Sequence, residues 1–367
     1  MMLPEMLRPV AVIASQALIT GSYTLVSEAI HLKMLPHLEV RYPSDTKGQL
    51  YIGTVNTILW IGCSLVVLYF QSSARMEHAY GFSITVAMLT TTVLLSVYLF
   101  CLRRKRIMAA AVLVVFGAIE IVFFVSSMGK FMHGGYVTVI LTLVLVAIMV
   151  IFYRGTLLEK KFCKDLMFTD HLDSLCQLHE DQSVPLYTQN LVYLEDSQDF
   201  QMMDRDILYS ILDKDPKRAQ AYWFISVNTL SEAKTMNYEV ETYGTDFIFR
   251  VRLNLGFQCE PRVNVYLRQI VQDLLSRGEL PEQAKKYSIY GPSNVGSFRF
   301  CIIHKTLPAK AGLSTLDHAM LSGKAAISNA AGKKVKWYGL DTSAVVEETV
   351  PLITGLPQTS DTIVRKE

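Results

Sequence analysis

Five long apolar runs in the first 153 residues constrain this chain more than any other feature. Each run is long enough to cross the roughly 30 Å hydrocarbon layer of a membrane, which takes about 20 residues of α-helix. The runs cover residues 9–30, 51–70, 79–100, 108–128 and 135–153. Because a backbone in lipid must satisfy its own hydrogen bonds, each run is predicted to form a transmembrane helix.

The composition changes sharply after the last run. The whole chain is 51% hydrophobic, but the charged residues gather in its second part. We therefore predict a membrane domain over residues 1–154 and a basic, amphipathic linker over 155–185. A soluble domain is expected over 186–355, followed by a loosely ordered tail over 356–367, where Pro, Thr, Ser and Asp are common.

Basic residues lie in alternate gaps between the apolar runs. The three basic segments hold Lys33, Arg41 and Lys47; then Arg103, Arg104, Lys105 and Arg106; then Arg154, Lys160, Lys161 and Lys164. By the positive-inside rule these segments, and the soluble domain with them, are predicted to lie in the cytoplasm. The N-terminus is then outside. With no visible targeting signal, this suggests the back part of a longer membrane domain.

The third apolar run opens with a candidate cation site. Tyr80, Ser83, Ala87 and Thr91 share one helix face after an Ala79-Tyr80-Gly81 step. Phenol and hydroxyl oxygens can replace the water around a partly dehydrated cation. Small and hydroxyl residues also let membrane helices pack closely, and the spacing alone favours such a packing seam, which is the commoner use of these residues.

Glu120 is the only carboxylate near the middle of any of the five runs. A charged, unpaired carboxylate is costly in lipid, so the group is predicted to be protonated or partnered. Two roles remain open for it: proton exchange, or a structural contact with a neighbouring helix.

The soluble part alternates strand-like and helix-like segments. The strand-like segments are 190–194, 221–227, 247–253 and 298–304, and residues 168–182, 205–212 and 263–275 have helical spacing. This alternation predicts an α/β domain. The segment 221–227 is almost wholly apolar, as in a strand covered on both faces. The segment 247–253 alternates in its second half and is predicted to be half-exposed.

No pattern of enzyme chemistry stands out in the soluble part. The sequence has no phosphate-binding loop of the G-x-x-x-x-G-K-[ST] type, no G-x-S-x-G elbow and no G-x-G-x-x-G fingerprint. The formal net charge of +2 favours no nucleic-acid partner. We therefore predict a protein that is not an enzyme and that needs neither a cofactor nor a bound metal.

Several short motifs recur along the membrane part. In chain order they are Ile13-Ala14-Ser15-Gln16-Ala17, Tyr42-Pro43, Gly48-Gln49-Leu50-Tyr51-Ile52, Ala79-Tyr80-Gly81, Glu120 with Phe123-Phe124, Lys130, and Gly134-Gly135. In this order and spacing the chain resembles the KUP/HAK/KT potassium uptake transporters. That family has twelve membrane helices and a cytosolic C-terminal domain, and the five runs resemble its helices eight to twelve.

The resemblance implies K⁺ uptake across the cytoplasmic (inner) membrane, coupled to H⁺ entry by alternating access. The implied fold is a partial LeuT-like bundle of the amino acid–polyamine–organocation superfamily, followed by a cytosolic α/β domain. Tyr80 would belong to the K⁺ site, with Ser83 and Thr85 as neighbours. Glu120 matches a position outside the ten-helix core, which favours a structural or dimer role.

The implied partners are K⁺, protons, membrane lipid, the N-terminal helices of the same protein and a second copy in a homodimer. The 367 residues alone would then not transport, because alternating access needs both repeats of such a bundle. The alternative is a membrane-tethered regulatory or scaffold module that moves no ion.

Overall fold

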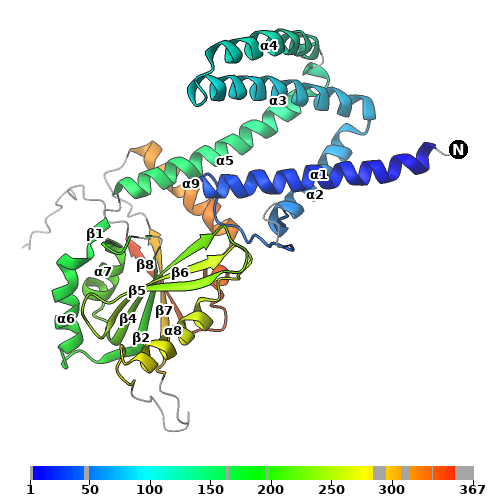
Figure 1. Ribbon diagram of the computed structural model, residues 1–367. Helices are drawn as coiled ribbons and strands as arrows, with labels where there is room; N and C mark the ends of the chain where they lie inside the picture. Colours follow the sequence, from blue (N-terminus) through cyan, green and yellow to red (C-terminus); the bar gives the residue numbers. More distant parts are fainter. Residues whose placement is uncertain are drawn as a thin grey trace, which may run out of the picture. The chain divides into compact units, whose positions relative to one another are not determined.

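The computed structural model describes residues 3–44, 49–129, 131–162, 165–195, 197, 199–283, 295–306, 314–332 and 334–351. The tail predicted for 356–367 lies outside these residues, as does Lys130. The chain begins with five helices that cover the five apolar runs (Figure 1): α1 (Leu3–His31), α2 (Gly53–Phe70), α3 (Ser73–Cys101), α4 (Arg106–Met128) and α5 (Gly135–Phe162).

Four of these helices, α2 to α5, are long and apolar enough to cross a membrane. Over the described residues, α1 is not one of these candidate spans. It contains the polar residues Gln16, Thr20 and Glu28.

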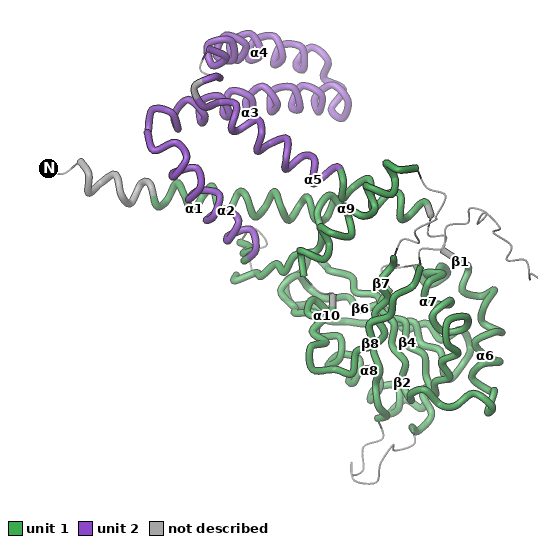
Figure 2. Tube along the Cα trace, turned by 180° about the vertical axis from the view of Figure 1, so that it is seen from behind, with its two compact units in different colours: residues 1–53, 151–367 green, residues 54–150 purple. Residues whose placement is uncertain are grey.

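The chain divides into two compact units (Figure 2). One unit is formed by residues 54–150, and the other by residues 1–53 together with 151–367. In the first unit α3 and α4 lie side by side, joined by a short turn at residues 102–105. The second unit is built around a six-stranded sheet.

The strands of this sheet are β2 (Leu186–Glu195), β4 (Arg218–Leu230), β5 (Met236–Glu241), β6 (Ile248–Gly256), β7 (Phe298–Thr306) and β8 (Val345–Pro351). Their order is β5-β6-β4-β2-β7-β8, and every neighbouring pair is parallel except β5 with β6. The chain starts in the middle of the sheet, builds one side, and returns to build the other. The four predicted strands are confirmed as the four central ones.

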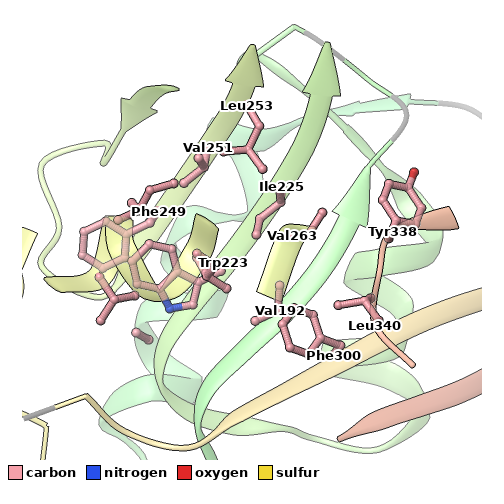
Figure 3. Close-up of a cluster of buried hydrophobic side chains, with 14 of the residues drawn as sticks. Val192, Trp223, Ile225, Phe249, Val251, Leu253, Val263, Phe300, Tyr338 and Leu340 are labelled. Carbon is pink, nitrogen blue, oxygen red and sulfur yellow. The ribbon is translucent and has the colours of Figure 1, made fainter. Parts of the chain in front are cut away.

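Both faces of the sheet are covered. On one face α8 (Val263–Arg277) packs over a cluster that includes Trp223, Phe249 and Phe300 (Figure 3). The other face is covered by η2 (Phe168–His171), α6 (Leu172–Glu180) and α7 (Arg205–Leu208). The apolar run 221–227 lies in β4, between β6 and β2, which explains why it lacks a polar face.

Smaller elements complete the described chain. They are η1 (Phe131–His133), β1 (Asp165–Met167), β3 (Met202–Asp204), η3 (Tyr209–Lys214), α9 (Thr315–Ala331) and α10 (Lys334–Trp337). β1 and β3 form a separate antiparallel pair.

The prediction of a half-exposed strand at 247–253 was wrong, because β6 is buried along almost its whole length. Arg250 is only 2% exposed. Its Nη2 lies 2.5 Å from Glu195 Oε2, and its Nη1 and Nη2 donate to the carbonyl oxygens of Phe200 and Met202. A buried guanidinium is tolerated when a carboxylate and carbonyl oxygens pair with it.

Candidate functional site

Helix α3 carries the predicted site, and its two faces differ. Ala79, Phe82, Thr85, Thr92, Ser96 and Leu99 are buried. These positions lie three, four or seven residues apart, so they form one face of the helix, and α3 packs with α4. The rest of α3 is largely exposed in the described chain.

Tyr80 and Ser83 lie outside the buried face. The Tyr80 side chain is 63% exposed. Ser83 Oγ donates a hydrogen bond to the carbonyl of Ala79 at 3.0 Å and is half-buried. Ala87 and Thr91, one and two turns further on, are exposed as well. The phenol, hydroxyl and small-residue face therefore stays open on this helix.

Thr85 belongs to the opposite, buried face. Its hydroxyl donates to the carbonyl of Gly81 at 2.6 Å and lies 3.3 Å from Ser127 Oγ of α4. The structure thus brings Thr85 to α4 and not to Tyr80. The separation follows from helix geometry, because positions five apart point about 140° away from each other.

Glu120 of α4 contacts α3 at Thr92, about two helical turns after Thr85. Its side chain is 5% exposed, and Thr92 Oγ1 donates to its Oε1 at 2.8 Å. The second oxygen, Oε2, is buried and has no hydrogen-bond partner within the described chain. A groove of about 290 Å³ runs beside the carboxyl group, lined by Ile84, Ala87, Met88, Thr91, Thr92 and Glu120.

Thr92 is the partner that sequence reasoning missed. Its position gives the signal, because Thr85, Thr92 and Ser96 follow the spacing of one helix face. Chemically, this pair offers a carboxyl group with one free oxygen and a hydroxyl in apolar surroundings. Such a group can hold a proton, or it can tie two helices together.

The glycines of the Gly134-Gly135 motif hold a tight junction. Gly134 has a φ of +144°, and a Cβ there would lie 3.0 Å from both the carbonyl oxygen of Arg75 and the ring of Phe70. Helix α5 begins at Gly135, and Tyr136 OH lies 2.5 Å from Tyr69 OH. The motif therefore fixes the chain where α2, α3 and α5 meet.

The described residues contain no group of three or more His, Cys, Asp or Glu side chains placed to hold a metal ion. Ligands of doubly wound sheets bind beyond the carboxyl ends of the strands where the strand order reverses. Glu195, at that end of β2, is already paired with Arg250.

Comparison with known proteins covers both parts of the chain. A family model described as the K⁺ potassium transporter integral membrane domain matches residues 6–157, and one described as the K⁺ potassium transporter C-terminal domain matches 188–351. The chain belongs to this potassium transporter family. The resemblance seen in the motifs is confirmed.

Curated relatives in the family are similar along nearly all of the chain. The probable potassium transport system protein Kup of Lacticaseibacillus casei is 43% identical over 365 residues, and that of Enterococcus faecalis is 46% identical over 356 residues. These matches cover 96% and 97% of this chain but only 53% of each relative. The chain thus spans about half the length of these potassium transporters. No solved structure matches it.

Proposed function

We propose that this chain is part of a transporter that takes up K⁺ across the cytoplasmic membrane. The observation that carries the proposal is the 43% to 46% identity, over 94% to 97% of the chain, to proteins named as potassium transport system proteins. The membrane-length helices α2 to α5 and the α/β domain agree with it. Family members are transporters and not enzymes, and K⁺ is cargo, so no cofactor is needed.

The finer proposal is K⁺/H⁺ symport by alternating access in a LeuT-like bundle. In such folds the site lies near the middle of the membrane and is completed by helices from both repeats. The described helices supply one side of it, and the N-terminal helices of the complete protein supply the rest. The α/β domain lies in the cytoplasm in this proposal, and a homodimer is compatible with it.

The ion site is proposed on the open face of α3, where Tyr80 and Ser83 present neutral oxygens. The proposal is supported by the exposure of this face within the chain, because a face that packs against helices outside the chain would be exposed here. Thr85, the third proposed residue, lies on the opposite face of α3 and supports the site indirectly, by a hydrogen bond that fixes α3 to Ser127 of α4. For Glu120, the unpartnered Oε2 supports proton exchange, while its bond to Thr92 supports a structural role.

Uptake of Rb⁺, as a surrogate for K⁺, tests the proposal in cells that lack their own high-affinity K⁺ uptake. Three proteins are compared: these 367 residues alone, the protein completed with its front helices, and the completed protein with Tyr80→Phe. We expect uptake only by the completed protein. Loss of one neutral oxygen ligand should raise its KM for Rb⁺ about five-fold, the equivalent of about 1 kcal/mol.

Tyr153→Phe is the matched control, since it removes a phenol oxygen from α5 at an exposed position, and its KM should not change. If Tyr80→Phe also left KM unchanged, transport would stand and the site would move elsewhere. A folded, completed protein without uptake would favour the membrane-tethered regulatory module.

A further inference from the structure

The turn between α3 and α4 concentrates positive charge. The turn and the first residue of α4 hold four consecutive cations, Arg103, Arg104, Lys105 and Arg106, and all four side chains are exposed. Backbone hydrogen bonds from Arg103 to Tyr98 and from Lys105 to Leu99 hold the turn, at 3.2 and 3.0 Å. Arg104 adopts a φ of 54°, which closes the connection within a few residues. The four charges are therefore kept close together.

No carboxylate in the hairpin can neutralise this cluster. From residue 78 to residue 119 the sequence contains no Asp or Glu. Glu77 is near the far end of α3, roughly 36 Å from Cys101 at 1.5 Å per helical residue, and Glu120 is bonded to Thr92. Over the described ranges, none of the ion pairs includes a residue of the turn.

The contacts that the cations do make are with aromatic rings. Arg103 Nε donates to Tyr98 OH at 3.2 Å, and the Arg106 guanidinium lies 5.6 Å from the centre of the Phe100 ring. These contacts orient the two side chains but leave their charges uncompensated. A counter-anion must therefore come from outside the hairpin.

The apolar residues beside the four cations indicate where the anion lies. Leu102 and Ile107, which flank the cations, are 72% and 88% exposed. The turn also ends two helices that are apolar enough to cross a membrane. Cations set between exposed apolar and aromatic side chains at a helix end are typical of the boundary between lipid and water.

We propose that the α3–α4 turn binds the phosphodiester headgroups of anionic lipids. The planar guanidinium groups match two phosphate oxygens at once, and Lys105 adds a point charge. Leu102 and Ile107 anchor the turn among the acyl chains beside the bound headgroups. The proposal depends on α3 and α4 crossing the membrane, as in the proposed function, but not on which ion is transported.

Native mass spectrometry of the purified protein in a neutral detergent tests this site. Dioleoyl phosphatidylglycerol and dioleoyl phosphatidylcholine are titrated separately, and bound lipids are counted. We expect phosphatidylglycerol to bind at least ten-fold more tightly than phosphatidylcholine. Replacing all four cations (Arg103→Gln, Arg104→Gln, Lys105→Gln and Arg106→Gln) should remove this preference. Arg→Lys changes at the three arginines, which keep the charge, should retain most of it.

The matched control neutralises the third basic segment, with Arg154→Gln, Lys160→Gln and Lys161→Gln. It should keep the phosphatidylglycerol preference. Equal binding of the two lipids, or an equal loss in both neutralised variants, would overturn the proposal. Competition by millimolar inorganic phosphate would also overturn it, by assigning the site to a free anion. Rb⁺ uptake is a separate readout, so failure of the transport proposal remains distinguishable.

Discussion

At the scale of single residues, the most informative group is Glu120. The sequence marks it as the one carboxylate near the middle of a membrane run, but its partner becomes clear only from the pairing of α3 with α4. Thr92 satisfies one oxygen, and the other remains without a hydrogen bond in the described residues. One hydrogen bond thus positions the carboxyl group, while its second oxygen keeps an unused hydrogen-bonding position.

Glu120→Gln separates the two roles proposed for this residue. Glutamine has the same shape and can still accept the bond from Thr92, but it cannot exchange a proton. In the completed transporter we expect Rb⁺ uptake driven by a proton gradient to fall at least ten-fold, with the melting temperature nearly unchanged. Thr92→Val, the companion variant, should instead destabilise the protein by about 1 to 3 kcal/mol, because it leaves the carboxyl group without a donor. Normal proton-driven uptake by Glu120→Gln would leave only the structural role.

At the scale of elements, periodicity and hydropathy predicted which segments become helices and strands, but not which polar side chains are buried. β4 was recognisable because both of its faces are apolar. β6 was misjudged because Arg250 reads as a solvent-facing residue, while its partner Glu195 is 55 residues away in the sequence. Thr85 was grouped with Tyr80 by proximity in the sequence, whereas the helix turns them to different faces.

Helix α5 shows the same limit at its end. The apolar run stops at residue 153, but the helix continues to Phe162. Hydropathy indicates which residues suit lipid, but it does not indicate where the helix ends. The extension packs against α9: a Cβ on Gly155 would lie 2.7 Å from Lys324 Cβ, and one on Gly323 would lie 2.7 Å from Ile151 Cγ2. Lys324 also pairs with Glu159. Small residues on both helices therefore permit a close crossing.

Gly155→Ala tests this crossing. Helix propensity alone predicts a gain of about 1 kcal/mol, whereas the close approach of α9 predicts a loss of about 1 to 3 kcal/mol. We expect the loss to win, because the obstructing atoms are a Cβ and the backbone oxygen of Met320 rather than the end of a flexible side chain. The readout is thermal unfolding in detergent. Gly21→Ala, in α1 with nothing within 4 Å, is the control and should not destabilise. A higher melting temperature for Gly155→Ala would show that the two helices do not pack this closely.

At the scale of the whole molecule, the connection between α1 and α2 belongs to the same compact unit as the α/β domain. The ring of Tyr42 lies 4.9 Å from that of Phe257, just after β6, and the ring of His37 lies 4.9 Å from that of Trp337. Ile52, at the end of the connection, is fully buried. The Tyr-Pro motif that helped to reveal the family therefore contributes to a joint between two distant parts of the sequence.

A double-mutant cycle on Tyr42→Ala and Phe257→Ala measures the strength of this joint. Edge-to-face aromatic pairs contribute about 0.5 to 1.5 kcal/mol beyond the area they bury. The losses of unfolding free energy in the two single variants should therefore sum to more than the loss in the double variant, by that amount. The measurement is chemical unfolding of the full chain in detergent, followed through the α/β domain. Phe298, at the start of β7 and so at the other end of the parallel strands, supplies the control. Tyr42→Ala combined with Phe298→Ala should be additive within about 0.5 kcal/mol. If the Tyr42 and Phe257 losses were equally additive, the connection would not pack on the domain, and changes in the α/β domain would have no direct route to α1 through this contact.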